Sequence, residues 1–242
     1  MEQKIEEMKD KVPAFPSSEE WQKISQSFAR AVMRGAIGAV LKLDDEARNI
    51  VLREIGAAAC ESFLQTEGKK WQTDGLPQVA KAVMSGAFKG ILKLDEQAKR
   101  LVLMATGTAC FQRHLESYRS WEAAGIPLTP GSYDVDSTVT LLEKQMPFRE
   151  VKREGDTIFW KGKELRARYG GCTCCLVQSG ITEPVPELCQ CGTWCQKIQF
   201  EYYTGIPMEA ELVETLNTGS QNDCEFRIHI RPTLYTTQNP VS

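Results

Sequence analysis

The sequence lacks the features that mark several large classes of protein. It has only two histidines in 242 residues, which excludes a metal site built mainly from histidine. No apolar run approaches the roughly 18 residues of a membrane-spanning helix, and the charged first ten residues lack the apolar segment of a signal peptide. The net charge of −3 gives no basic excess for general nucleic-acid binding. We therefore expect a cytoplasmic protein that binds neither membranes nor nucleic acids.

Several catalytic motifs are also missing. The sequence contains no Gly-x-Gly-x-x-Gly, no phosphate-binding loop and no Gly-x-Ser-x-Gly, so the standard nucleotide-binding and serine-hydrolase interpretations have no support. Apolar residues make up 42% and charged residues 25% of the chain, as in ordinary globular proteins. The length is enough for one or two domains.

The cysteines are unusually arranged, because most of them lie close together in the sequence. There are nine, an odd number that argues against a closed set of disulfides, and seven of them fall between Cys172 and Cys224. In a reducing compartment, a cluster of this kind indicates metal binding or redox chemistry.

The first half of the chain contains an internal repeat. The segment AVMRGA at 31–36 returns as AVMSGA at 82–87, and LKLD at 41–44 returns at 92–95. The offset is 51 residues here, and it becomes 50 if the later Ala-Cys pairs are matched. Two copies are too few for a solenoid, so we predict a duplicated helical hairpin, at about 19–71 and 77–121, within a helical region spanning 1–130.

Local signals place the helices of each hairpin. Asp44 and Asp95 stand where an N-cap is needed, because their carboxylates can accept hydrogen bonds from the free amides of the next helix. Cys60 and Cys110 are interpreted as small, buried apolar residues of these helices.

The second half, 131–242, has a different pattern, typical of an α+β domain with an antiparallel sheet. The expected elements are a helix at 134–145, a hairpin at 148–165, a strand at 165–169, a helix at 189–203 and two strands at 208–216 and 224–230. The predicted fold class is therefore α+β, with the duplicated hairpins packed on a cysteine-rich sheet domain.

Two Cys-x-Cys pairs and a later cysteine form the candidate metal site. On an extended strand, residues i and i+2 share a face, so both thiolates of a pair can reach one cation. Zn²⁺ takes four such ligands in tetrahedral geometry, and an iron–sulfur cluster takes the same ligands. The candidates are Cys172, Cys174, Cys189, Cys191 and Cys224, with Cys175, Cys195 and Glu214 ranked second. Redox-active or catalytic thiols, and cysteines that merely pack, remain as alternatives.

Apolar residues on the predicted helix at 189–203 suggest where a ligand would bind. Trp194, Ile198 and Tyr202 recur at spacings of four and form a stripe beside Cys191 and Cys195. The stripe could line a pocket next to the metal, or it could pack the helix on the rest of the fold.

The C-terminal part also resembles a known family. The segments CQCG at 189–192, Gly205, ELVE at 211–214 and DCEF at 223–226 resemble the 4-vinyl reductase-type ligand-binding domain superfamily, including its uncharacterised bacterial, thiazoline carboxylate hydrolase-like relatives. The resemblance covers Arg149 to Pro232. It implies a small-molecule-binding α+β domain that often holds zinc.

The resemblance also implies metal ligands. They are Cys191 or Cys189, then Glu214, then Cys224. This chain departs from the family pattern at Asn217, where a cysteine is expected. We infer that Cys172 or Cys174 replaces that ligand.

Three functions follow from these patterns. The first is a zinc-containing small-molecule-binding or sensor protein, the second a metal- or cysteine-dependent hydrolase or lyase, and the third a protein-interaction module with a structural zinc. An open coordination position would favour the enzyme, and a closed four-ligand site would favour a structural role. A small molecule is the expected partner, and a homodimer is an assembly that the sequence allows.

Overall fold

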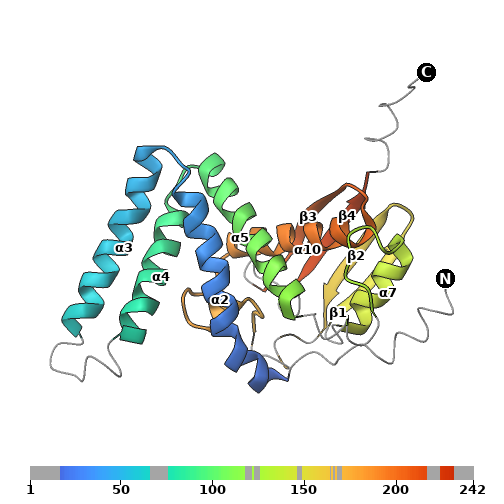
Figure 1. Cartoon of the computed structure of the whole chain (residues 1–242), viewed down its shortest axis with the longest axis horizontal. Helices are drawn as coiled ribbons and strands as arrows, with labels where there is room; N and C mark the ends of the chain where they lie inside the picture. The colour runs from blue at the N-terminus through green and yellow to red at the C-terminus, as the bar shows by residue number, and fades with distance from the viewer. Residues whose placement is uncertain are drawn as a thin grey trace.

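The computed structural model describes residues 17–65, 76–117, 122, 126–145, 149–163, 165, 167, 171–216 and 224–231. These residues form seven helices and a four-stranded antiparallel sheet, with four long helices first and the sheet in the second half (Figure 1). The fold is α+β, as predicted. None of the helices in these ranges is both long and apolar enough to cross a bilayer.

Four helices make up the first half. Their bounds are α2 Ser18–Val40, α3 Asp45–Gln65, α4 Leu76–Leu92 and α5 Glu96–Ser117. The predicted caps are confirmed, because a carboxylate oxygen of Asp44 accepts from the amide of Ala47 and one of Asp95 accepts from the amide of Ala98. The two predicted hairpins are α2 with α3 and α4 with α5. The main contacts join α3 to α4 and α2 to α5, so the helices of one hairpin pack on those of the other and hardly on each other.

The contacts of two glycines reveal the repeat in space. A Cβ on Gly35 of α2 would lie 2.5 Å from Ala109 Cβ of α5, and a Cβ on Gly86 of α4 would lie 2.8 Å from Ala58 Cβ of α3. Both partners in these contacts are offset by 51 residues. The offset of 51 therefore holds through the second helices, without the one-residue gap that matching the Ala-Cys pairs requires. Cys110 is equivalent to Ala59, not to Cys60.

The sheet has the order β1-β2-β4-β3, formed by β1 Arg149–Glu154, β2 Thr157–Gly162, β3 Met208–Glu214 and β4 Glu225–Ile230. Its strands bury alternate side chains on one face, where Trp160 is paired with Phe226 and Ile158 with Ile228. Helices α7 Val135–Gln145 and α10 Leu188–Thr204 pack on this face. The predicted end of α10 is confirmed, since Gly205 adopts φ 68°, which glycine tolerates best.

The predicted strand at 165–169 is wrong where the structure describes it, because residues 165 and 167 are helical. Strand β2 ends at Gly162, where a Cβ would lie 2.7 Å from Leu165 Cδ1. Leu165 is fully buried, so the chain folds back onto the sheet instead of continuing it. The prediction that Cys172 and Cys174 share a strand face is also wrong. Cys174 is instead the N-cap residue of a short helix, α9 Cys175–Gln178.

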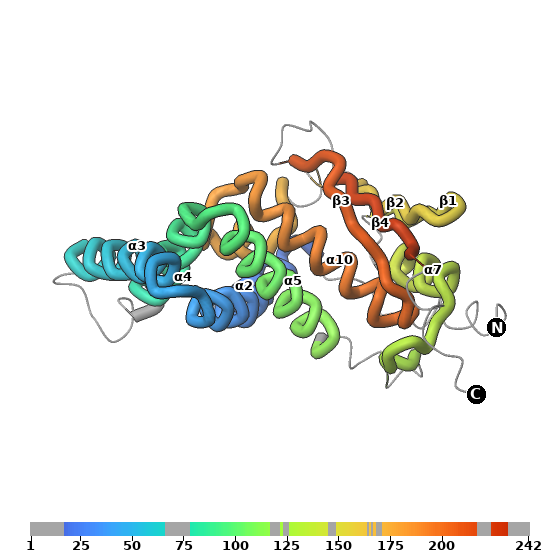
Figure 2. Tube along the Cα trace, turned by 90° about the horizontal axis from the view of Figure 1, so that it is seen from above, coloured from blue at the N-terminus to red at the C-terminus, as the bar shows by residue number. Residues whose placement is uncertain are grey.

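Helix α10 connects the two halves of the molecule. It lies between α5 and the sheet (Figure 2). One buried apolar cluster joins α2–α5 with α9 and the start of α10, and a second joins α7, the rest of α10 and the sheet. The division of the chain at residue 130 stays a prediction.

Candidate metal centre and cavity

Eight of the nine cysteines line one cavity of about 130 Å³ where the two halves meet. Helix α2 supplies the apolar wall with Trp21, Phe28 and Val32, and Leu188 and Phe226 extend it from α10 and β4. The cysteines come from α5, the segment preceding and beginning α9, helix α10 and the residue before β4: Cys110, Cys172, Cys174, Cys175, Cys189, Cys191, Cys195 and Cys224. The cavity is therefore apolar and rich in thiols.

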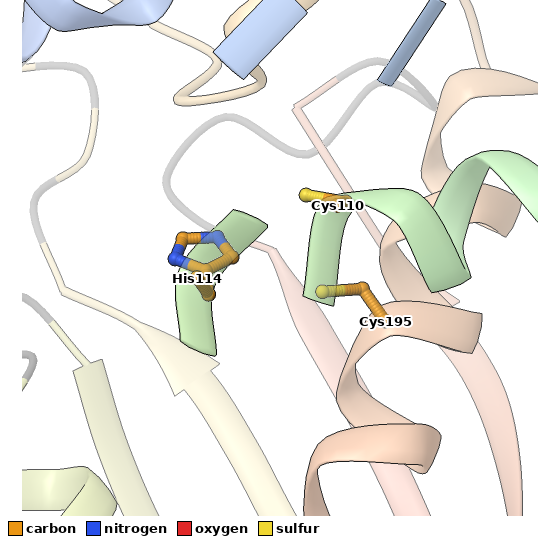
Figure 3. Close-up of side chains that lie close together, drawn as sticks. All are labelled: Cys110, His114 and Cys195. Atoms are coloured by element: carbon orange, nitrogen blue, oxygen red, sulfur yellow. The ribbon is translucent and has the colours of Figure 1, made fainter. Parts of the chain in front are cut away.

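Three side chains at this cavity form a group suited to a metal ion. The ligand atoms of Cys110, His114 and Cys195 all lie within 4.8 Å of one another, the one such group of three or more found in the described part of the chain. Figure 3 shows the first two on neighbouring turns of α5 and the third on α10. Ligands of tetrahedral Zn²⁺, with Zn–S bonds near 2.3 Å, lie about 3.8 Å apart, so movements of about 1 Å would complete the geometry.

A close helix crossing creates this group. A Cβ on Gly107 of α5 would lie 2.6 Å from the carbonyl oxygen of Cys191 and 2.8 Å from Trp194 Cβ. Only glycine permits this approach of α5 to α10. Cys110 and His114 follow at i+3 and i+7, on the same side of α5, so the crossing brings them beside Cys195.

Aromatic rings hold the His114 imidazole at the cavity wall. Its centroid lies 4.9 Å from that of Phe28, at an interplanar angle of 60°, and 6.5 Å from that of Trp21, nearly parallel. The Trp21 indole N–H donates to the carbonyl oxygen of Thr173 at 3.2 Å, which ties α2 to the cysteine segment. The packing limits the orientations of the imidazole.

The thiols are connected by hydrogen bonds that stabilise negative charge on sulfur. Hydrogen bonds from Cys175 and Cys195 hold the pKa of Cys110 well below the usual value of a thiol, and those from Cys175 and Cys191 lower the pKa of Cys174. Donation raises the pKa of Cys175, Cys191 and Cys195. A thiol has one proton, so Cys175 donates either to Cys110 or to Cys174, and Cys191 donates either to Cys174 or to the carbonyl oxygen of Leu188. The nearby His114 also lowers the pKa of Cys110.

Two further groups set the electrostatics of the cavity. Burial, together with repulsion from Cys174, raises the pKa of Cys172 to about 12, so this thiol remains neutral. The guanidinium of Arg149 on the cavity wall stacks 5.6 Å from the Trp160 ring and donates to Thr173 Oγ1. No carboxylate is among the described residues that line the cavity, so its charged groups are the Arg149 guanidinium and the thiols with a lowered pKa.

The five cysteines first predicted as metal ligands all line this cavity, as do Cys175 and Cys195. Two of these thiols also have hydrogen-bond acceptors that are not cysteines. Cys189 Sγ donates to Thr215 Oγ1 at 3.2 Å, and the carbonyl oxygen of Leu188 lies 2.9 Å from Cys191 Sγ as an acceptor. Glu214 is exposed at the end of β3 and does not line the cavity. Asn217 lies outside the described residues. One tetrahedral site made from the predicted cysteines stays a prediction.

The apolar stripe predicted on α10 lies outside the cysteine cavity. None of Trp194, Ile198 and Tyr202 lines the cysteine cavity. Trp194 packs at the α5 crossing and borders a separate, more open groove, with Arg100 and Lys197 at 6.0 and 5.5 Å from its ring. Tyr202 donates to the carbonyl oxygen of Leu128, and Ile198 is half-buried. Ligand binding by this stripe stays a prediction.

Cys110 and His114 are the candidate ligands that the sequence interpretation missed. Cys110 was predicted to be a packing residue, yet it borders the cavity. Its partner in that prediction, Cys60, is exposed on α3 rather than buried. The spacing Cys-x-x-x-His on a helix places both side chains on one face, and this signal could have identified them.

Comparison with known proteins adds no relative. No family model matches the chain, and neither does any curated protein or solved structure. The resemblance to the 4-vinyl reductase-type superfamily therefore stays a prediction, and the interpretation of the site depends on its chemistry alone.

Proposed function

We propose that the protein is a zinc-containing small-molecule-binding protein. Cys110, His114 and Cys195 would hold the ion, and the adjoining apolar cavity would receive the ligand. The observation that carries the proposal is the convergence of two sulfurs and an imidazole, from two helices, on a cavity with apolar walls. Cysteine and histidine are the ligands that zinc favours.

The electrostatics of the cavity support a cation at this position. An anionic Cys110 in apolar surroundings carries a desolvation cost, which a bound cation would offset. Arg149 also lines the cavity, so a ligand that combines an apolar body with a negatively charged group would suit the remaining space.

Metal analysis of anaerobically purified full-length protein tests the proposal. We expect about one zinc per chain. Cys195→Ser and His114→Ala should each weaken zinc binding at least about 100-fold, because each removes a ligand. Cys60→Ser is the matched control and should keep the metal, since Cys60 is exposed on α3.

Two further measurements separate the alternatives. Cys174→Ser should retain zinc if Cys110, His114 and Cys195 hold it, and should lose zinc if the Cys-x-Cys pairs do. Iron and acid-labile sulfide in place of zinc would indicate an iron–sulfur cluster. Metal-free protein that binds neither zinc nor cobalt would contradict the proposal.

A metal-dependent hydrolase or lyase is the second candidate. Three protein ligands leave one position of a tetrahedral ion for water or substrate, which is the arrangement of catalytic zinc. Cys175 donates to Cys110 and is the candidate for a fourth, closing ligand. Cobalt-substituted protein distinguishes an open three-ligand site from a site closed by Cys175. The visible spectrum of an open site changes when a small anion such as azide is added, and that of a closed site does not.

A further inference from the structure

Strand β3 lies at the edge of the sheet, with a groove beside it. Among the described strands it pairs only with β4, and α10 runs alongside it (Figure 2). The groove has a volume of about 450 Å³. Its lining includes Arg100 of α5, Trp194 and Lys197 of α10, and Ala210 and Leu212 of β3. The size is within the usual range of ligand-binding clefts.

The hydrogen-bond pattern between β3 and β4 shows which amides of β3 point outward. The Arg231 N–H donates to the carbonyl oxygen of Pro207 at 3.0 Å, so this pair is hydrogen-bonded. Such pairs alternate, in antiparallel sheets, with pairs whose groups point away from each other. The N–H groups of residues 208, 210 and 212 therefore point away from β4. Those of Ala210 and Leu212 have no hydrogen-bond partner among the described residues.

The first of these outward amides already binds a carboxylate. The Met208 N–H donates to Glu201 Oε1 of α10 at 2.9 Å, and the same oxygen accepts from Lys197 Nζ at 2.6 Å. An edge amide and a neighbouring cation thus form a carboxylate site at this end of β3. Ala210 and Leu212 continue the row of outward amides along the groove.

Arg100 adds a second cation to the groove. Its guanidinium lies 6.0 Å from the centroid of the Trp194 ring, and it forms no ion pair within the part of the chain that the structure describes. Glu209, which also lines the groove, is paired with Arg231 at 2.7 Å. A guanidinium presents a fork of N–H donors that matches a carboxylate. The charge of the groove therefore favours an acidic occupant.

A second copy of β3 would be a poor occupant. Glu209 and Glu211 are exposed on the same face of the strand. If two β3 strands paired antiparallel through their outward amides, the carboxylates of one copy would lie against those of the other. Like charges opposite each other destabilise a strand pair, and charged residues on an edge strand oppose self-association.

We propose that this groove binds an extended acidic peptide of another protein, which adds to the sheet as a fifth strand beside β3. The peptide carbonyl groups accept from the N–H groups of Ala210 and Leu212. Alternate peptide side chains face the groove, and an acidic one pairs with Arg100. The site is separate from the proposed zinc centre, because no described residue lines both cavities.

A random-peptide library displayed on phage, selected on the full-length protein, provides the probes. The selected peptides should combine acidic with β-branched residues, and fluorescence anisotropy measures their affinities as synthetic peptides. Arg100→Glu should weaken binding at least about 10-fold, because it reverses the charge that pairs with the peptide. Arg34→Glu is the matched control, since Arg34 is exposed on α2 and does not line the groove, and it should bind like the wild type.

Ala210→Pro tests the strand addition itself. It removes an outward N–H, and an edge strand tolerates proline at such a position, so the far-UV circular dichroism should be unchanged. Peptide binding should weaken at least about 10-fold, because a main-chain hydrogen bond is lost. In the wild type, bound peptide should slow hydrogen exchange at the amides of Ala210 and Leu212.

Three results would overturn the proposal. One is a selection that enriches no peptide over the library background. Another is peptide binding that neither Arg100→Glu nor Ala210→Pro weakens. The third is a dimeric wild type, by sedimentation equilibrium, that Ala210→Pro converts to a monomer, because a second copy would then occupy the edge of β3.

Discussion

At the scale of single residues, the side chains of α10 divide into two sets with different tasks. Cys191 and Cys195 border the thiol cavity, whereas Trp194, between them in sequence, lies at the crossing with α5. The helix turns by about 100° per residue, so neighbours in sequence point in different directions. The stripe that suggested a ligand wall therefore does not border the cavity that the cysteines form.

Trp194→Ala tests this division. We expect the free energy of unfolding to fall by about 2 kcal/mol, less than for a fully buried tryptophan, because Trp194 is only half-buried. Zinc content should stay at the level of the wild type. Chemical denaturation and metal analysis of the same sample measure both. Loss of zinc with unchanged stability would contradict the assignment of Trp194 to packing.

At the scale of elements, the start of α7 depends on one carboxylate. Asp134 accepts a hydrogen bond from the amide of Ser137 at 2.7 Å, and hydrogen bonds from the side chain and backbone of Ser137 lower the pKa of Asp134. The helix that begins here covers the sheet with Leu141 and Leu142. A local capping interaction thus supports one layer of the second core.

Asp134→Ala should lower the free energy of unfolding by about 1 kcal/mol at pH 7, and Asp134→Asn should lower it less, since the amide oxygen still accepts. The pKa is lower in the folded state, so the stabilisation by the charge is present above the unfolded pKa of about 3.9 and is lost as the pH falls through the folded value. The difference between wild type and Asp134→Asn should therefore shrink on acidification. A difference that grows toward low pH would contradict this.

At the scale of the whole molecule, Gly107 connects the helical half to the sheet half. The crossing at this residue positions two candidate ligands on α5 against the third on α10, and it also joins the two cores. Stability and the proposed metal binding would therefore share one structural cause.

Gly107→Ala should reduce both properties. A Cβ only 2.6 Å from the Cys191 carbonyl oxygen forces the helices apart, which we expect to cost about 1–3 kcal/mol and to weaken zinc binding. Gly38→Ala, at an open position of α2, is the control and should raise stability by up to about 1 kcal/mol. Thermal denaturation and competitive zinc titration provide the measurements. Equal behaviour of the two variants would refute the role of the crossing.

Local chemistry made part of this protein predictable. The caps at Asp44 and Asp95, the end of α10 at Gly205 and the alternation of β2 and β4 depend on neighbours within a few residues, so the sequence alone located them. The crowding of cysteines between Cys172 and Cys224 likewise indicated one thiol-rich site, and all seven line the cavity.

The α+β class, the repeat and the cysteine cluster were predictable, because composition and periodicity carry these properties. Which residues converge depends on how the helices pack in three dimensions. The repeat offers equivalent faces on α3 and α5, but α10 covers only the one with Cys110 and His114, and a close contact at Gly107 brings Cys195 to them. Residues 110 and 195 are far apart along the chain, and their approach depends on the packing of whole helices, which no local pattern specifies.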